Sequence, residues 1–230
     1  MADNPFPVML FAAGFGTRMK ALTQDKPKPM IEVAGRPMID HALGLAEQAG
    51  ATRLVANLHY RPDDLRRHLE PRGVVCVIET PDILETGGGL RNALPTLGAG
   101  PVMTMNTDAI WAGPNPLTLL QAAWRPDEMD ALLMGISPAN AVGHQGDGDF
   151  TRDADGLLRR GPGLIYGGVQ IIKTDLLAQI DARAFSLNLL WDRMLAASRL
   201  HGLEYPGRWC DVGHPDGIGM AERLLEGEDV

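Results

Sequence analysis

Residues 11–30 read FAAGFGTRMKALTQDKPKPM, and they join an apolar run to a glycine-rich turn and then to a basic, proline-rich segment. Residues 8–12 are continuously apolar, which is typical of a strand buried on both faces of a parallel sheet. Open α/β sheets bind their ligands beyond the carboxyl ends of the strands. We therefore expect the glycine turn at the ligand-binding edge of a sheet.

The glycine turn itself, Gly14-Phe15-Gly16-Thr17-Arg18, has the composition of a phosphate-binding loop. Glycines let the backbone approach a phosphate and direct N–H groups at it. A dinucleotide fingerprint needs a third glycine where Met19 stands, and the sequence of a Walker loop is absent. The turn alone leaves two interpretations: a phosphate-binding loop of another type, with Arg18 reaching phosphate oxygens, or a plain tight turn.

The segment Lys26-Pro27-Lys28-Pro29 favours the phosphate interpretation. Each proline fixes its own φ angle and biases the residue before it toward extended geometry. Both lysines are then stiffened before a ligand arrives, which suits a cation that meets a developing charge. A solvated basic turn is the alternative, and the position of the segment just after Gly-Thr-Arg argues against it.

Two aspartates are candidate metal ligands. Asp108 ends the apolar stretch VMTMNTD, and Asp211 lies in WCDVG near the end of the chain. A single aspartate at a strand end is usually a cap or turn residue. Two carboxylates that converge on a phosphate loop would instead suit Mg²⁺, which favours one or two protein carboxylates together with phosphate oxygens and waters.

Composition limits the class of protein. The chain has 230 residues, 45% of them hydrophobic, and a net charge of −8, which disfavours nonspecific binding to nucleic acid or to an anionic membrane. Cys76 and Cys210 are far apart and are expected to be reduced. The apolar runs are too short to span a membrane, and MADNPFPVML lacks the features of a signal peptide. We expect a cytoplasmic monomer or small homo-oligomer without nucleic-acid or membrane partners.

Strand and helix patterns alternate as far as about residue 136, which predicts a Rossmann-like, doubly wound, mostly parallel sheet. Strands are expected at 8–12, 53–58, 74–78, 102–106 and 131–136, and helices at 37–49, 62–69, 87–94 and 116–124. The rest is expected to be irregular, with a hairpin turning at Asp155-Gly156, a strand at 168–172 and helices at 175–180, 188–198 and 216–225. The whole chain is expected to form one α/β domain.

Taken together, the motifs resemble those of the sugar-1-phosphate nucleotidylyltransferases. AAGFGTRM followed by KPKPM is similar to the signature Gly-x-Gly-Thr-Arg, a gap and Pro-Lys-Pro. The same family has segments similar to VAGRPMIDHAL, to the nucleobase loop LETGGGLRNAL, to NTD and to WCDVGHP. The short length and LETGGG are most similar to the N-acetylmuramate-1-phosphate uridylyltransferases of bacterial peptidoglycan recycling.

This resemblance implies a nucleotide-diphospho-sugar transferase (GT-A-like) fold, with a nucleotide-binding half at 1–136 and a sugar-binding half at 137–230. It implies that Arg18 and Lys28 are the catalytic cations, with Lys28 neutralising the α-phosphate and the sugar phosphate. It also implies nucleotide contacts from Ala13, Gly14, Gly16, Thr17, Arg18, Glu85, Thr86 and Gly87, sugar contacts from Asn106, Tyr166 and Gly167, and Mg²⁺ ligands at Asp108 and Asp211.

The implied reaction converts a nucleoside triphosphate and a sugar 1-phosphate into a nucleotide sugar and pyrophosphate, with UTP and N-acetylmuramate 1-phosphate as the best match. Alternatives are GTP with mannose 1-phosphate, CTP with phosphocholine, or a catalytically silent nucleotide-sugar sensor. Thr107 replaces a family glycine, and His214 replaces a family threonine. We interpret His59 as a hydrogen-bonded structural histidine.

Overall fold

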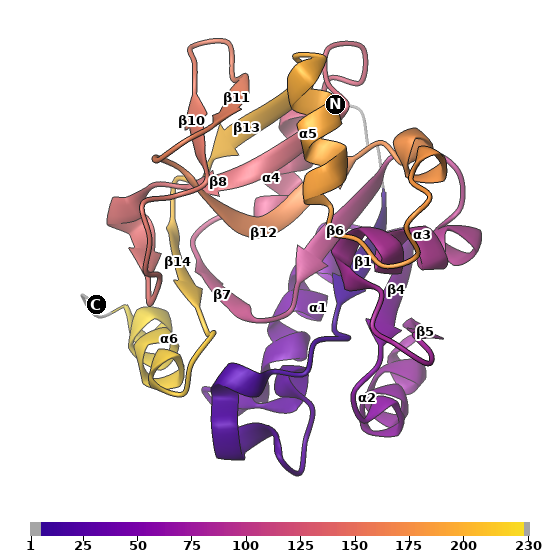
Figure 1. Cartoon of the computed structure of the whole chain (residues 1–230). Coiled ribbons are helices and arrows are strands. Elements are labelled where there is room, and N and C mark those ends of the chain that lie inside the picture. The colour runs from indigo at the N-terminus through magenta and orange to yellow at the C-terminus, as the bar shows by residue number, and fades with distance from the viewer. Residues whose placement is uncertain (1–5, 228–230) are drawn as a thin grey trace.

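The computed structural model describes residues 6–227, so residues 1–5, on which the signal-peptide expectation partly rests, lie outside it. Within this range the main sheet has seven strands in the order β13-β8-β12-β6-β1-β4-β5 (Figure 1). All run parallel except β12, which is antiparallel to both of its neighbours. The strands are β1 (Pro7–Phe11), β4 (Arg53–Leu58), β5 (Val75–Ile78), β6 (Val102–Asn106), β8 (Ala131–Ile136), β12 (Ile165–Ile172) and β13 (Leu200–Glu204).

Helices cover both faces of this sheet because its strands are apolar on both sides. In β1, Val8 and Leu10 point into one core, and Met9 between them points into the other. The first core is closed by α1 (Met38–Gln48), α2 (Pro62–Leu69) and α4 (Pro116–Ala123). The second is closed by α3 (Glu85–Leu97) and α5 (Asn188–Ala196). This arrangement confirms the predicted doubly wound α/β class.

A smaller layer of strands and one helix lies beyond the carboxyl end of β6. Here β7 (Ala109–Ala112), β14 (Arg208–Asp211) and β9 (Ala141–Val142) form a three-stranded sheet that packs on α6 (Asp216–Glu226). In this sheet β14 pairs with β7 in antiparallel register, with Asp211 opposite Ala109. Two further pairs are β2 (Glu32–Val33) with β3 (Arg36–Pro37) and β10 (Phe150–Arg152) with β11 (Leu158–Arg160).

The second half of the chain is less irregular than predicted. The hairpin at Asp155-Gly156 is present, but the late strand begins at Ile165 and lies inside the main sheet between β6 and β8. The segment at 175–180 is a 3-10 turn, Asp175–Gln179. The edge strand β13 was not predicted, because Gly202 and the polar His201 interrupt its apolar pattern.

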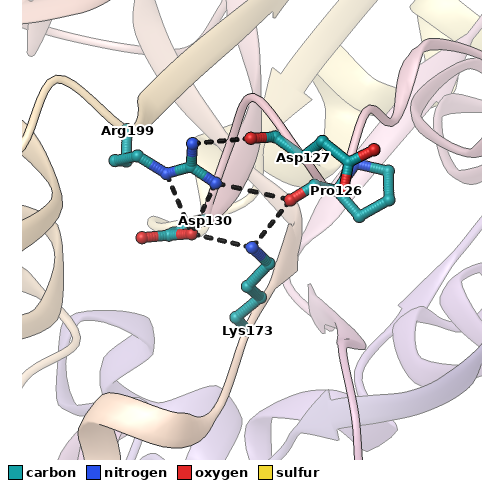
Figure 2. A network of polar contacts seen from close by, with 5 residues as sticks. All are labelled: Pro126, Asp127, Asp130, Lys173 and Arg199. Atoms are coloured by element: carbon teal, nitrogen blue, oxygen red, sulfur yellow. Dashed lines mark hydrogen bonds and ion pairs between the residues drawn. The ribbon is translucent and has the colours of Figure 1, made fainter.

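Figure 2 shows a polar network around Asp130, which immediately precedes the amino-terminal end of β8. The Asp130 carboxylate accepts hydrogen bonds from Lys173 Nζ at 2.9 Å and from Arg199 Nη2 at 3.0 Å. These side chains come from the ends of β12 and β13, so the network ties three adjacent strands together. Burial alone would raise the pKa of Asp130, but the hydrogen bonds from Lys173 and Arg199 lower it overall.

Candidate active site

A pocket opens at the carboxyl ends of β1 and β6, beside the start of α3. Because β1 and β6 are adjacent and parallel, their carboxyl ends meet at one edge of the sheet. Seven residues predicted for the site lie in its wall: Ala13, Gly14, Lys28, Glu85, Thr86, Asn106 and Asp108. The wall is completed by Phe11, Ala12, Pro29, Asn57, Ile83 and Thr107, which were not proposed as site residues.

The glycine loop forms one side of the pocket. A Cβ built at Gly14 has no neighbouring heavy atom within 4 Å, so the backbone there faces open space. Gly16 has a φ angle of 65°, and a Cβ at this position would lie 2.6 Å from the Cβ of Lys28. Glycine at position 16 therefore allows both the left-handed turn and the close packing of the loop on the Lys28 stem. Thr17 and Arg18 follow as exposed residues outside the pocket wall.

Lys28 begins a single 3-10 turn, Lys28–Met30, so the expectation of extended geometry is wrong for this residue. Pro29 causes no conflict, because proline is tolerated in the first turn of a helix, where an N–H has no partner. The Lys28 side chain is 10% exposed, and its Nζ donates a hydrogen bond to Asp108 Oδ2 at 2.7 Å. Its ammonium group is thus held at the pocket wall by a carboxylate.

Asp211 lies beside this ion pair. The Val212 N–H donates to the Asp108 carbonyl at 2.9 Å, which fixes the two aspartates on neighbouring chain segments. Burial, and then repulsion from the Asp108 carboxylate, raise the pKa of Asp211, although Lys28, Arg18 and His144 act in the opposite direction. The structure therefore gathers Arg18, Lys28 and the two carboxylates beside the pocket.

His144 belongs to this cluster but was not predicted. His144 lies close enough to Asp211 to lower the pKa of that carboxyl group, and its ring lies 6.2 Å from that of Trp209. The sequence around it, GHQGDGD, gives no signal of this, because the contact depends on β9 pairing with β14. His214, which replaces a family threonine, is exposed.

On the opposite side of the pocket, the start of α3 carries Glu85 and Thr86. Glu85 has a φ angle of 62°, which is rare for a non-glycine residue and typical of functional sites. The Thr86 hydroxyl accepts a hydrogen bond from the Leu187 N–H at 3.0 Å. Gly87 lies outside the pocket wall: its N–H donates to the Phe185 carbonyl at 2.8 Å, and a Cβ would lie 2.4 Å from the Phe185 ring. In this structure Gly87 serves helix packing.

The residues predicted for the sugar side are only partly brought together. Asn106 lines the pocket and packs against Gly168, where a Cβ would lie 2.9 Å from the Asn106 side chain. Tyr166 and Gly167 lie outside the wall. The Tyr166 ring packs edge-on against the Trp191 ring, with a distance of 4.8 Å between the ring centroids. Burial raises the pKa of the Tyr166 phenol. The Gly167 carbonyl accepts from Trp209 Nε1 at 3.1 Å.

Two other positions singled out in the sequence have structural partners. The Thr107 hydroxyl donates to the Phe11 carbonyl at 2.8 Å and so ties the end of β6 to the end of β1. His59 contacts the Glu79 carbonyl through Nδ1 at 2.9 Å, which agrees with its interpretation as a structural histidine. The substitution of glycine by Thr107 therefore adds a hydrogen bond between the two strands that lead into the pocket.

The fold and this site together define a nucleotidyltransferase with the nucleotide-diphospho-sugar transferase fold. The chain belongs to the MobA-like NTP transferase domain family, whose model matches residues 8–144. These findings confirm the predicted fold and enzyme class.

Comparison with individual proteins agrees with this assignment. The chain is 40% identical to the N-acetylmuramate alpha-1-phosphate uridylyltransferase of Caulobacter vibrioides, over 98% of this chain and 99% of that protein. It is 31% identical to the protein of the same name from Neisseria meningitidis serogroup B, over 89% and 92% of the two chains. The solved structure of the inositol-1-phosphate CTP transferase from T. maritima covers 98% of both chains with a TM-score of 0.79 at 13% identity, a likeness that concerns the fold alone.

Proposed function

We propose that the protein transfers a uridylyl group from UTP to N-acetylmuramate 1-phosphate and releases pyrophosphate. The observation that carries this proposal is the convergence of Lys28, Asp108 and Asp211 beside a pocket walled by a glycine loop and the start of α3. The 40% identity to a relative of that name, over nearly the whole of both chains, supports the choice of substrates.

The two reactants are both polyanions, so the main task of the site is to hold them together. The sugar phosphate needs no general base, because its second pKa is about 6 and it is already largely ionised near neutral pH. One of its oxygens forms a bond to the α-phosphorus of UTP, and the bond from that phosphorus to pyrophosphate breaks. Lys28 and Arg18 are proposed to neutralise the phosphate oxygens around this centre, since positioning and charge neutralisation dominate phosphoryl transfer.

Asp108 and Asp211 fit a Mg²⁺ site, because they offer two neighbouring carboxylates next to an open pocket. When bound, the ion would offset the negative charge of the phosphates. Burial and the neighbouring Asp108 carboxylate raise the pKa of Asp211, and a cation held between the two carboxylates would offset both effects. Lys28 pairs with Asp108 in this structure, and its ammonium group would be available to phosphate oxygens if Asp108 held the ion.

The glycine loop is proposed to hold the triphosphate through Ala13, Gly14, Gly16 and Thr17. Glu85 and Thr86 are proposed to contact the base and ribose, and Asn106 the sugar phosphate, because all three line the pocket. Direct contacts from Gly87, Tyr166 and Gly167 would require a change from the packing described above. In sequence terms, residues 1–136 would serve mainly the nucleotide and residues 137–230 the sugar.

We further propose that the enzyme acts in the cytoplasm in peptidoglycan recycling, as a monomer or small homo-oligomer. The names of two relatives contain N-acetylmuramate, a sugar of the cell wall, and this supports the proposed link to peptidoglycan. Among residues 6–227, the structure has no helix that is both long and apolar enough to cross a membrane.

A product analysis tests the proposed reaction. Purified protein is incubated with UTP, N-acetylmuramate 1-phosphate and Mg²⁺, and the products are separated and identified by mass spectrometry. The proposal requires UDP-N-acetylmuramate and pyrophosphate in equal amounts, and loss of both when Mg²⁺ is chelated. UTP hydrolysis without a nucleotide sugar, or no reaction by a folded protein, would contradict it.

A further inference from the structure

A chain of buried hydrogen bonds connects the two sides of the pocket, and two of its members, Ala12 and Asn57, lie in the pocket wall. The Ala12 N–H donates to Asn57 Oδ1 at 2.9 Å, and Asn57 Nδ2 donates to Glu79 Oε1 at 2.7 Å. The second carboxylate oxygen, Glu79 Oε2, accepts from the Leu84 N–H at 2.7 Å. We call these four groups the Asn57–Glu79 relay; it links the glycine-loop strand to the start of α3.

The direction of every hydrogen bond in the relay is fixed by chemistry. Only the oxygen of the Asn57 amide can accept from the Ala12 N–H, so its nitrogen must face Glu79. Glu79 must then accept at both oxygens, which a carboxylate does and an amide cannot. Asn57 is 3% and Glu79 1% exposed, so water does not replace either partner.

The surrounding backbone is shaped to admit this carboxylate. A Cβ at Gly89 would lie 2.6 Å from Glu79 Oε1 and 2.8 Å from Asn57 Nδ2, so only glycine lets α3 approach so closely. The Leu84 N–H immediately precedes Glu85, whose positive φ angle turns the chain into the pocket wall. A buried carboxylate costs free energy, and here it fixes a loop rather than filling a core.

We propose that Glu79 is a positioning residue for the nucleotide. It does not line the pocket, and it acts through Asn57 and the Leu84 N–H to set the distance between Ala12–Ala13 on one side and Glu85–Thr86 on the other. This inference rests on the proposed function only in assuming that the pocket takes a nucleotide.

The test is an exchange of the amide and the carboxylate. In Glu79→Gln, the new amide must accept from Leu84 with its oxygen, so its nitrogen faces the nitrogen of Asn57 and one contact becomes donor against donor. The double variant Asn57→Asp, Glu79→Gln restores every donor–acceptor pair: Ala12 N–H to Asp, Gln to Asp, and Leu84 N–H to Gln. The side-chain volumes are nearly unchanged throughout.

Asp130→Asn is the matched control. It makes the same carboxylate-to-amide change at another carboxylate that accepts several hydrogen bonds (Figure 2). Asp130 lies just before the amino-terminal end of β8, whereas the pocket lies at the carboxyl ends of β1 and β6. For each variant, calorimetry gives the Kd of whichever of the four NTPs the wild type binds most tightly, and kinetics give both KM values. Using that nucleotide keeps the inference testable even if the proposed substrate UTP is wrong.

We expect Glu79→Gln to raise the nucleotide Kd and KM about tenfold or more, because one buried hydrogen bond becomes repulsive. The KM for the sugar phosphate should stay within roughly twofold, and the double variant should recover most of the lost nucleotide affinity. Asp130→Asn should lower Tm without changing the nucleotide Kd. Folded Glu79→Gln with wild-type nucleotide affinity, or a double variant no better than Glu79→Gln, would overturn the positioning role.

Discussion

Lys28→Met separates the charge of Lys28 from its packing. The backbone turn at Gly16 lies against the Cβ and Cγ of Lys28, and methionine keeps this part of the stem while it removes the ammonium group. Loss of one charge that stabilises a phosphoryl-transfer transition state costs about 3–4 kcal/mol, which corresponds to a hundredfold to thousandfold loss of rate. We expect kcat/KM for UTP to fall by that factor, measured by coupled pyrophosphate release at saturating sugar phosphate.

The variant should nevertheless fold. It leaves Asp108 without its cation beside Asp211, but Asp108 is one-third exposed, so we expect a loss of only about 1 kcal/mol in unfolding free energy. Lys26→Met is the matched control, because Lys26 is exposed, lies two residues away and does not line the pocket. If Lys28→Met and Lys26→Met have the same kcat/KM, the catalytic role of Lys28 is wrong.

Three further predictions concern charge and backbone. Asp211→Asn should raise Tm in metal-free buffer at pH 7, because burial and the Asp108 carboxylate make the charged form of Asp211 unfavourable, and it should abolish the Mg²⁺-induced rise in Tm. Asp130→Asn should lower the unfolding free energy at pH 7 by about 1–3 kcal/mol. The pKa of Asp130 is lower in the folded state than in the unfolded state. Its contribution to the unfolding free energy is therefore present above the unfolded-state pKa of about 4 and is lost as the pH falls through the folded-state pKa. Urea unfolding should then give the same unfolding free energy for variant and wild type in acid. Gly16→Ala should reduce turnover even at temperatures where the variant is still folded, because the new Cβ would displace the Lys28 stem. Equal kinetics of variant and wild type would refute this packing.

Much of the first half of the fold follows from local sequence. The apolar runs at 53–58, 102–106 and 131–136 become β4, β6 and β8 with the predicted bounds, because buried parallel strands need apolar side chains on both faces. The turn at Gly16 was also recognisable, since a positive φ angle there requires glycine.

The later strands were harder to predict because their positions depend on distant partners. β12 lies between β6 and β8, strands that precede it in the chain, and its Gly167-Gly168 pair interrupts the apolar pattern, so the strand was predicted only from residue 168. Gly168 has a φ angle of 84° and packs on Asn106, a contact that local sequence cannot show. β13 completes the edge of the sheet with a glycine and a histidine in its middle.

The residues of the candidate site were likewise predictable only where a local sequence pattern marked them. Lys28 and Asp108 each stood in a recognisable local pattern, and the structure joins them by an ion pair. Glu79 and Asn57 were missed because each occupies an ordinary strand end, and only the pairing of β1, β4 and β5 brings their side chains together. Gly87 was assigned to the nucleotide on its motif alone, whereas its packing against Phe185 depends on a segment almost a hundred residues later.

The central claim is that this pocket joins a uridine nucleotide to an amino-sugar phosphate. A single screen tests it most directly: wild-type protein with Mg²⁺, the four NTPs each paired with N-acetylmuramate 1-phosphate, N-acetylglucosamine 1-phosphate and mannose 1-phosphate, and pyrophosphate release as the readout. We predict the highest kcat/KM for UTP with N-acetylmuramate 1-phosphate, at least roughly tenfold above CTP or GTP, since a mismatched base leaves buried polar groups unpaired. Preference for GTP with mannose 1-phosphate, or no release with any pair, would contradict the account.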